Sequence, residues 1–189
     1  MTGAILAGGQ SRRMGSNKAL IKVDGETIIE RTVRVFKKIF DDTIIIANDP
    51  LAYEDLSTRI YTDIHKGAGA LGGVYTALFH SSSQYTFVAA CDMPLLDEAS
   101  IRVIIGRAGL DAVVPYVDGR FHPMHALYSR RCMRAIEEMI KDGDLKINNL
   151  LERVMVRKLT VDDFKGAAIW ASVENINTPE DLSRITDGN

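Results

Sequence analysis

The chain has 189 residues, of which 46% are hydrophobic and 25% charged; these average values exclude a disordered or fibrous protein. The 23 basic and 25 acidic side chains give a net charge of −2, so there is no overall basic field to bind nucleic acid or an anionic membrane surface. Length and composition predict one domain over residues 1–189 that folds without a metal ion or a disulfide.

The two cysteines, Cys91 and Cys132, are too few and too isolated for a disulfide framework or a zinc site. They fit a reducing compartment. No charged and apolar leader stands before the first predicted strand, and no apolar run approaches the ~18 residues of a membrane span. We therefore expect a cytoplasmic protein that is neither exported nor inserted in a membrane.

Apolar runs typical of strands alternate with helical patterns along the chain. In chain order we expect a strand at residues 1–6, a helix at 27–40, strands at 43–47 and 59–62, a helix at 71–80, a strand at 85–91, a helix at 97–106, a strand at 111–115 and a helix at 130–141. The β-branched run TIIIA at 43–47 is typical of a strand covered on both faces. Near the C-terminus, Thr178 and Pro179 mark the start of a further helix.

Strands that alternate with helices of this length connect through right-handed crossovers, so the pattern predicts an α/β fold with a mostly parallel sheet. In such open sheets the ligand binds beyond the carboxyl ends of the strands. The residues just after Leu6, Ala47, Thr62 and Cys91 are therefore the candidates for a functional site.

The loop after the first predicted strand, residues 6–18 (LAGGQSRRMGSNK), combines glycine with positive charge. Its glycines and cations are Gly8, Gly9, Gly15, Arg12, Arg13 and Lys18. Glycine lets the backbone turn sharply and bring its N–H groups against an anion, and three cations can face the phosphates of a nucleotide. The spacing fits neither the dinucleotide fingerprint nor the P-loop, because Gly15 comes late and alanine follows Lys18.

Polar side chains follow three more of the predicted strands. Asn48, Asp63 and Asp92 each stand at such a strand end. A carboxylate at the end of a central strand suits Mg²⁺, which binds through one or two carboxylates together with substrate phosphates. We expect Asp92 to hold this ion, with Asn48 and Asp63 on the same rim.

The four histidines do not form a metal-binding or catalytic pattern. His122, in the segment DGRFHP, follows a turn and is expected to line the cleft, whereas His65, His80 and His125 lack metal-ligand spacing. The sequence contains no G-x-S-x-G elbow and no Cys/His pair that would indicate covalent catalysis.

With these motifs the chain resembles the nucleotidyltransferases that activate sugar phosphates and pterin cofactors. Residues 6–18 match their pattern L-A-G-G-x-x-x-R-M-G-x-x-K. The segment CDMP around Asp92, the pair His122–Pro123 and the segment NINTPEDL at 175–182 narrow the resemblance to the molybdenum cofactor guanylyltransferases, from residue 3 to about residue 185. NINTPEDL is the most specific segment, because general sugar nucleotidyltransferases usually lack it.

This resemblance implies a single-domain, three-layer α/β/α, Rossmann-like nucleotidyltransferase fold. It implies a nucleotide-binding half at residues 1–95 and a pterin-binding half at 96–189. The implied nucleotide-binding residues are Leu6, Ala7, Gly8, Gly9, Lys18, Asn48, Asp63 and Asp92. The implied residues for the second substrate are His122, Asn175 and Asn177.

The implied reaction transfers GMP from GTP to the terminal phosphate of molybdopterin and releases pyrophosphate. The implied partners are GTP, molybdopterin and the maturation proteins of molybdoenzymes. Because two polyanions must meet, catalysis should come from charge neutralisation and alignment, with Lys18, Arg13 and Mg²⁺ on Asp92 in the catalytic roles. A general base is hardly needed, since the attacking phosphate is already ionised.

Two other interpretations stay open at this point. A cytidylyltransferase of the same pterin, or a sugar-phosphate nucleotidyltransferase, would use the same first loop. A nucleotide-binding adaptor without activity, which delivers the cofactor to apoenzymes, would bind GTP but not turn it over.

Overall fold

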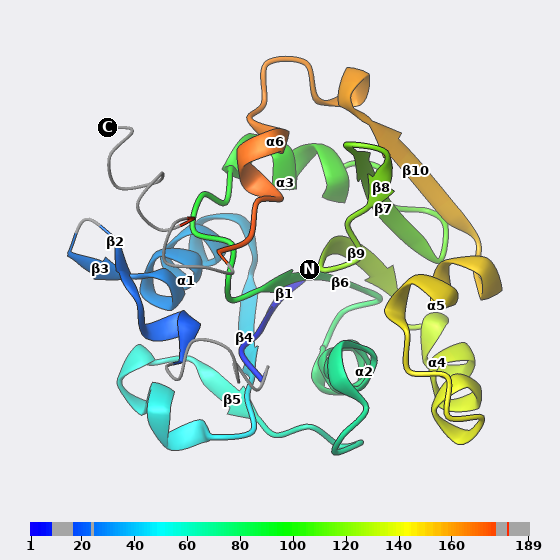
Figure 1. Ribbon diagram of the computed structural model, residues 1–189, viewed down its shortest axis with the longest axis horizontal. Coiled ribbons are helices and arrows are strands. Elements are labelled where there is room, and N and C mark those ends of the chain that lie inside the picture. The colour runs from blue at the N-terminus through cyan, green and yellow to red at the C-terminus, as the bar shows by residue number, and fades with distance from the viewer. Residues whose placement is uncertain (9–16, 24, 177–180, 182–189) are drawn as a thin grey trace.

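A computed structural model describes residues 1–8, 17–23, 25–176 and 181 (Figure 1). The strands are β1 (Thr2–Leu6), β2 (Lys22–Val23), β3 (Glu26–Thr27), β4 (Asp42–Ile46), β5 (Arg59–Tyr61), β6 (Tyr85–Ala90), β7 (Ala112–Val117), β8 (Arg120–Phe121), β9 (His125–Ser129) and β10 (Val156–Thr160). The α-helices are α1 (Ile28–Ile39), α2 (Gly69–His80), α3 (Glu98–Ile105), α4 (Cys132–Lys141), α5 (Ile147–Arg153) and α6 (Ile169–Ser172). The helix start expected at Thr178 lies outside the described residues. Among the described helices, none has the length and hydropathy that a membrane crossing requires.

The large sheet has the strand order β10-β7-β9-β6-β1-β4-β5, with β8 paired to β7. β1, β4, β5 and β6 are mutually parallel and β10 is parallel to β7, whereas β9 lies antiparallel between β6 and β7. The α/β fold with a mostly parallel sheet is therefore confirmed, and the four long predicted helices begin and end within two residues of their predicted bounds.

The sequence prediction is wrong at the far side of the sheet. It does not include β8, β9 and β10, and it ends a strand at Pro115, whereas β7 continues to Val117. Pro115 is tolerated inside β7 because it lies between the residues paired with β9 and those paired with β8, so its missing N–H breaks neither antiparallel ladder.

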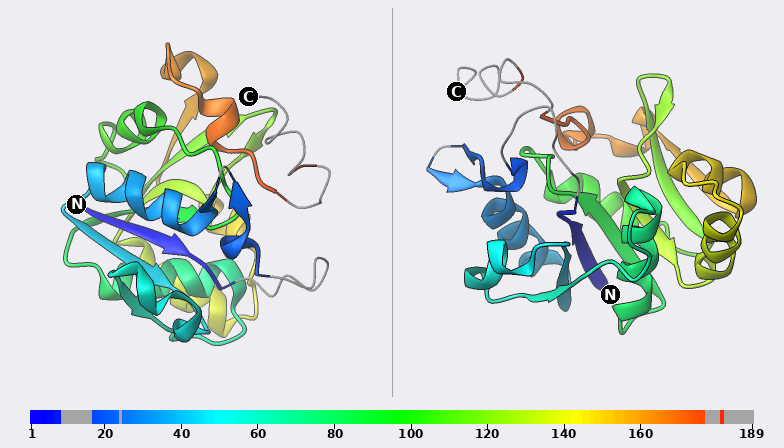
Figure 2. Two further views of the ribbon diagram at one scale, coloured as in Figure 1. Left: turned by 90° about the vertical axis from the view of Figure 1, so that its left-hand side faces the viewer. Right: turned by 60° about the horizontal axis from the view of Figure 1, so that its bottom comes forward.

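Both faces of the sheet are covered by helices. Ile5 and Phe87 are fully buried in the cluster that contains α1 and α3, and Ala4 and Val88 are fully buried in the opposite cluster with α2, α4 and α5. This alternation follows from the two-residue repeat of a strand. The strands thus form the middle layer of an α/β/α arrangement (Figure 2).

Helix α1 begins with a capping box, in which Thr27 Oγ1 accepts a hydrogen bond from the Glu30 N–H and the Glu30 carboxylate accepts one from the Thr27 N–H at 2.7 Å. Its buried face packs directly on Gly3 of β1, where a Cβ would clash with the rings of Phe36 and Phe40. Glycine at this position lets the helix approach the centre of the sheet.

Acidic side chains at the amino ends of the parallel strands are paired within the fold. Asp42, at the start of β4, forms an ion pair with Arg59 at the start of β5. Asp111, just before β7, accepts hydrogen bonds from Arg131 Nε at 2.6 Å and from the Met155 N–H at 3.0 Å. We call this side of the sheet the amino edge, and the opposite side the carboxyl edge.

Candidate functional site

The carboxyl edge contains a cavity of about 490 Å³ where the chain changes faces of the sheet. The connection from β1 to β4 passes through α1 on one face, and the connection from β5 to β6 passes through α2 on the other. Ligands bind at such switch points in open α/β sheets. The walls include Leu6 and Gly8 after β1, Asn48 after β4, Asp63 after β5 and Asp92 after β6, so the structure brings together the strand ends expected from the sequence.

Asn48 and Asp63 form a polar pair on the β4–β5 side of this first cavity. Asn48 Nδ2 donates a hydrogen bond to Asp63 Oδ2 at 2.9 Å. Asp63 Oδ1 is buried and has no hydrogen-bond partner among the described residues. Gly8 lies against both side chains, since a Cβ there would be 3.4 Å from Asn48 Nδ2 and 3.7 Å from Asp63 Oδ2. The pair therefore presents an unused acceptor close to the backbone of the first loop.

Asp92 and Lys18 face each other across the end of β6. Lys18 Nζ lies 3.9 Å from Asp92 Oδ2, and the two side chains are 17% and 21% exposed. Burial raises the pKa of Asp92, and the charge of Lys18 acts in the opposite direction. Asp92 Oδ1 is buried without a hydrogen-bond partner in the described part of the chain, so this carboxylate has an oxygen available for a cation.

Tyr53 ties the two ends of the first loop together. This buried side chain donates a hydrogen bond from its hydroxyl to the Ala7 carbonyl at 3.3 Å and accepts one from Asn17 Nδ2 at 2.7 Å. Asn17 Oδ1 also accepts from the Ala19 N–H, which caps the short helix that carries Lys18. Tyr53 therefore fixes the residues that flank the loop, and sequence reasoning missed it because no motif connects a tyrosine in the 50–56 turn with residue 7.

The start of α2 forms another wall of the first cavity. Gly67 and Gly69 have positive φ values of 82° and 56°, and both line the cavity together with Ala70. Ala68, the N-cap residue of this twelve-residue helix, makes no side-chain hydrogen bond to its N-terminus. Unoccupied backbone N–H groups at a helix N-terminus attract anions. The segment KGAGALGG at residues 66–73 is rich in glycine, but the sequence prediction does not include Gly67, Gly69 or Ala70 in the site.

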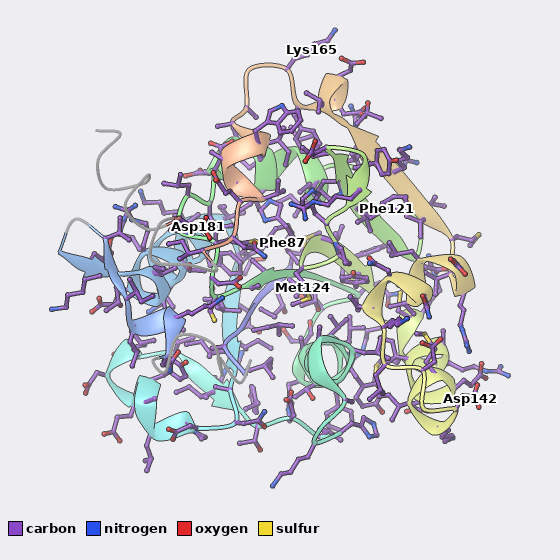
Figure 3. The ribbon with its side chains drawn as sticks, viewed as in Figure 1. Phe87, Phe121, Met124, Asp142, Lys165 and Asp181 are labelled. Carbon is purple, nitrogen blue, oxygen red and sulfur yellow. The ribbon has the colours of Figure 1, made fainter. Side chains whose placement is uncertain are left out.

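A second cavity of about 170 Å³ adjoins the first. Met124, labelled in Figure 3, lines both cavities. The expected residues His122 and Asn175 meet here, together with Met93, Arg120, Phe121, Pro123 and Val173. Asn175 Oδ1 is buried and lacks a hydrogen-bond partner among the residues that the structure describes.

His122 is held in one orientation in this second cavity. It is 8% exposed, and its Nε2 lies 3.2 Å from the Val117 carbonyl oxygen. Burial holds the pKa of His122 below its usual range; the Val117 carbonyl acts in the opposite direction, and the Arg120 charge lowers the pKa further. Because a carbonyl accepts, Nε2 carries the proton, and Nδ1 is left as an acceptor.

The segment that carries Asn175 is fixed against the end of β6. The Ile176 N–H donates a hydrogen bond to the Asp92 carbonyl at 2.9 Å. On the same segment, Ser172 Oγ lies 3.2 Å from Nε2 of the fully buried His125. Residues far apart in sequence are thereby joined, and Asn175 is placed next to the strand end that presents Asp92.

Three of the expected site residues, Gly9, Arg13 and Asn177, lie outside the described residues. Cys91, which lines the first cavity, is no nucleophile near neutral pH, because burial raises the pKa of its thiol to about 12. No group of three His, Cys, Asp or Glu side chains that could hold a metal occurs within residues 1–8, 17–23, 25–176 and 181. Asp92 Oδ1, which has no partner in the described part of the chain, instead fits a cation that takes a single carboxylate and completes its shell with phosphate oxygens and water.

The chain is similar to known proteins over most of its length. The family model described as the MobA-like NTP transferase domain matches residues 3–159. A relative from Desulfosudis oleivorans, named molybdenum cofactor guanylyltransferase, is 38% identical over 190 residues, which cover 97% of this chain and 93% of the relative.

Solved structures show the same architecture. The molybdopterin-guanine dinucleotide biosynthesis protein A of Archaeoglobus fulgidus superposes with a TM-score of 0.86 at 32% identity, covering 99% of this chain and 97% of that one. A 4-diphosphocytidyl-2C-methyl-D-erythritol synthase from Anaerococcus prevotii has a TM-score of 0.72 at 14% identity, with 99% and 94% covered. The second likeness shows the shared fold alone.

Proposed function

The chain belongs to the MobA-like NTP transferase family, and within it to the molybdenum cofactor guanylyltransferases. From this premise we propose that it transfers GMP from GTP to molybdenum-molybdopterin. The reaction releases pyrophosphate and forms the guanine dinucleotide cofactor. The observation that carries the proposal is the meeting of two cavities beside Asp92 at the end of β6. Its Oδ1 has no hydrogen-bond partner among the described residues, and Lys18 Nζ lies 3.9 Å from its other oxygen. One cavity suits a nucleotide and the other suits the acceptor.

The first cavity is assigned to GTP. Leu6 and Gly8 line this cavity, as do Gly69 and Ala70 at the start of α2. We assign the backbone contacts to the nucleotide to Leu6, Ala7, Gly8 and Gly9, with further N–H groups from the start of α2. Asp63 Oδ1 is an acceptor without a partner among the described residues, and Asn48 orients this carboxylate. Guanine carries two neighbouring donors, N1–H and the amino group, that a carboxylate accepts side by side, whereas cytosine offers a single amino donor next to an acceptor.

Catalysis rests on charge neutralisation at the junction of the cavities. Lys18 and Arg13 neutralise charge on the phosphates of GTP and on the attacking phosphate of the acceptor, which are brought together although both are anionic. Asp92 holds the divalent cation that the family uses, proposed here to be Mg²⁺, which supplies further charge neutralisation when bound. The acceptor phosphate attacks the α-phosphorus of GTP, and pyrophosphate leaves without a covalent enzyme intermediate.

The acceptor occupies the second cavity, with His122, Asn175 and Asn177 on its side. We assign nucleotide binding to residues 1–95 and acceptor binding to residues 96–189 of one domain. This assignment is supported by the cavity linings, because the strand ends of the first cavity come before residue 95 and most of the second cavity comes after it. The cytoplasm supplies GTP, and maturation proteins of molybdoenzymes take up the product.

A nucleotide panel tests the proposal. Purified protein is incubated with Mg²⁺, molybdopterin and GTP, CTP, ATP or UTP, and released pyrophosphate is measured. We expect release with GTP and little with the others. Release with CTP alone would assign a cytidylyltransferase, and a sugar phosphate that replaces molybdopterin as acceptor would assign a sugar nucleotidyltransferase. GTP binding without any turnover would indicate an adaptor.

A further inference from the structure

Arg120 at the rim of the second cavity has a guanidinium group that the proposed reaction does not use. Its side chain is exposed, lines the cavity and has no carboxylate partner among the described residues. Most described arginines form an ion pair with an aspartate or a glutamate of the fold. These include Arg34, Arg59, Arg102, Arg131, Arg134 and Arg153. The donors of Arg120 are therefore available to a ligand.

The hairpin that carries Arg120 is rigid. Val117 pairs with Arg120 across a two-residue turn, Asp118–Gly119, with positive φ values of 52° and 69°. Such turns match the twist of antiparallel strands. At its base, the rings of Phe121 and Tyr116 meet edge to face at 5.0 Å. The position of Arg120 above the cavity is thus set by a short, well-packed hairpin rather than by a long loop.

The cavity walls are complementary to a flat, polar heterocycle. Met93, Met124, Val173 and Phe121 supply apolar surface. Two residues that line the cavity carry acceptors: Asn175 Oδ1, which has no partner among the described residues, and, by the tautomer that the Val117 carbonyl selects, His122 Nδ1. Arg120 adds parallel N–H donors at the rim. The pyrimidinone edge of a pterin has the matching groups, namely an amino group and a ring N–H that donate and a carbonyl oxygen that accepts.

We infer that Arg120 is a specificity-determining residue for the acceptor, which donates to the carbonyl edge of the pterin in the second cavity while Asn175 Oδ1 accepts from its amino edge. The inference rests on the proposed function and adds the orientation of the second substrate. With the ring in this cavity, the side chain that ends in the phosphate passes Met124 towards Asp92 and the first cavity.

A binding experiment separates this inference from the transfer reaction. Neopterin monophosphate, a fluorescent pterin with a phosphorylated side chain, is titrated into the protein saturated with Mg²⁺ and α,β-methylene-GTP, which cannot be cleaved. We expect Arg120→Ala to weaken binding of the pterin by about tenfold or more, because a charged hydrogen bond is lost, and Arg120→Lys to give an intermediate loss. The matched control is Arg157→Ala, which removes an exposed arginine from the edge strand β10.

Each outcome decides a different claim. Unchanged pterin binding in Arg120→Ala, or no pterin binding by the wild-type protein saturated with α,β-methylene-GTP, would overturn the inference. A loss of affinity that is seen equally with glycerol phosphate would assign Arg120 to the phosphate and also overturn it. Failure of the wild-type protein to bind α,β-methylene-GTP would instead contradict the proposed function.

Discussion

The two edges of the sheet use aspartate in opposite ways. At the amino edge, Asp111 has both oxygens bonded, one to Arg131 Nε and the other to the Met155 N–H. At the carboxyl edge, Asp63 and Asp92 each keep one buried oxygen without a partner among the described residues. All three aspartates lie next to a strand end, so their positions along the strands do not distinguish them. They differ in whether both carboxylate oxygens have hydrogen-bond partners among the described residues.

The pKa values of two of these aspartates reflect the same contrast. Burial raises the pKa of Asp92, and Lys18 only partly offsets this. Partial burial also raises the pKa of Asp111, but the hydrogen bonds from Arg131 and Met155 outweigh it and hold the pKa below its usual range. A carboxylate whose two oxygens accept hydrogen bonds from the fold stabilises the fold. A carboxylate with an oxygen that accepts none is available to a ligand.

The largest effect on the transfer reaction is expected for Asp92→Asn, at the carboxyl edge. We expect the rate of GMP transfer to fall by about 100-fold or more, because the residue that holds the cation is lost. The melting temperature should stay close to that of the wild-type protein, since within the described residues no hydrogen bond depends on the carboxylate oxygen Oδ1. Transfer is measured as pyrophosphate release and folding by circular dichroism, and a melted spectrum would assign Asp92 to structure.

Lys18→Ala should lower the transfer rate by about 100-fold, since a main electrostatic contact to the phosphates is removed. The matched control is Lys22→Ala, an exposed lysine on β2 that lies outside both cavities. Steady-state kinetics with GTP measure both variants. Equal transfer rates for Lys18→Ala and Lys22→Ala would show that Lys18 is not a catalytic residue.

Asp63→Asn should lower kcat/KM for GTP by about tenfold or more and narrow the preference for GTP over CTP, because an amide cannot accept two guanine donors side by side. Asp55→Asn, an exposed aspartate of the 50–56 turn, serves as the control. If the ratio of kcat/KM for GTP to kcat/KM for CTP is the same in Asp63→Asn as in the wild-type protein, this carboxylate does not contribute to base recognition.

Asp111→Asn tests the amino edge. We expect the free energy of unfolding to fall by about 1–2 kcal/mol, because hydrogen bonds that join β7, α4 and β10 are weakened. The transfer rate per folded molecule should stay unchanged. Denaturant melts measure the stability, and pyrophosphate release measures the transfer rate. A loss of transfer without a loss of stability would show that Asp111 acts in the reaction and does not stabilise the fold.

The smallest expected effect is in the pH dependence of stability. Because the pKa of Asp111 is lowered in the folded chain, its contribution is fully present above its ordinary pKa of 3.8 and is lost as the pH falls through the folded value. The difference in stability between the wild-type protein and Asp111→Asn should therefore shrink as the pH falls below about 4. A difference that grows in acid would show that the pKa is not lowered.

The sequence predicts the half of the sheet around β1 well and the far side poorly. Apolar runs such as TIIIA identify strands that are covered on both faces. β9 is equally buried and, like β1 and β4, five residues long, but its sequence HALYS contains no β-branched residue and begins just after Pro123. β10 is an edge strand whose residues Arg157 and Lys158 are exposed, so its composition resembles that of a loop.

The site follows the same division. Asn48, Asp63 and Asp92 could be named from the sequence because the carboxyl ends of parallel strands converge. Tyr53 and Arg120 could not, since their roles depend on contacts between segments that no spacing in the sequence reveals. The unpartnered oxygens of Asp63, Asp92 and Asn175 likewise become visible only once every neighbouring donor is placed.

The most direct test follows the α-phosphate of GTP in the wild-type protein, Asp92→Asn and Asp111→Asn side by side. GTP labelled with ³²P at the α-phosphate is incubated with Mg²⁺, molybdopterin and each protein, and the labelled products are separated. We predict that the wild-type protein and Asp111→Asn transfer the label to the pterin, whereas Asp92→Asn leaves it in GTP. Full transfer by Asp92→Asn, or label in free GMP instead of the dinucleotide, would contradict the assignment of GMP transfer to the carboxyl edge.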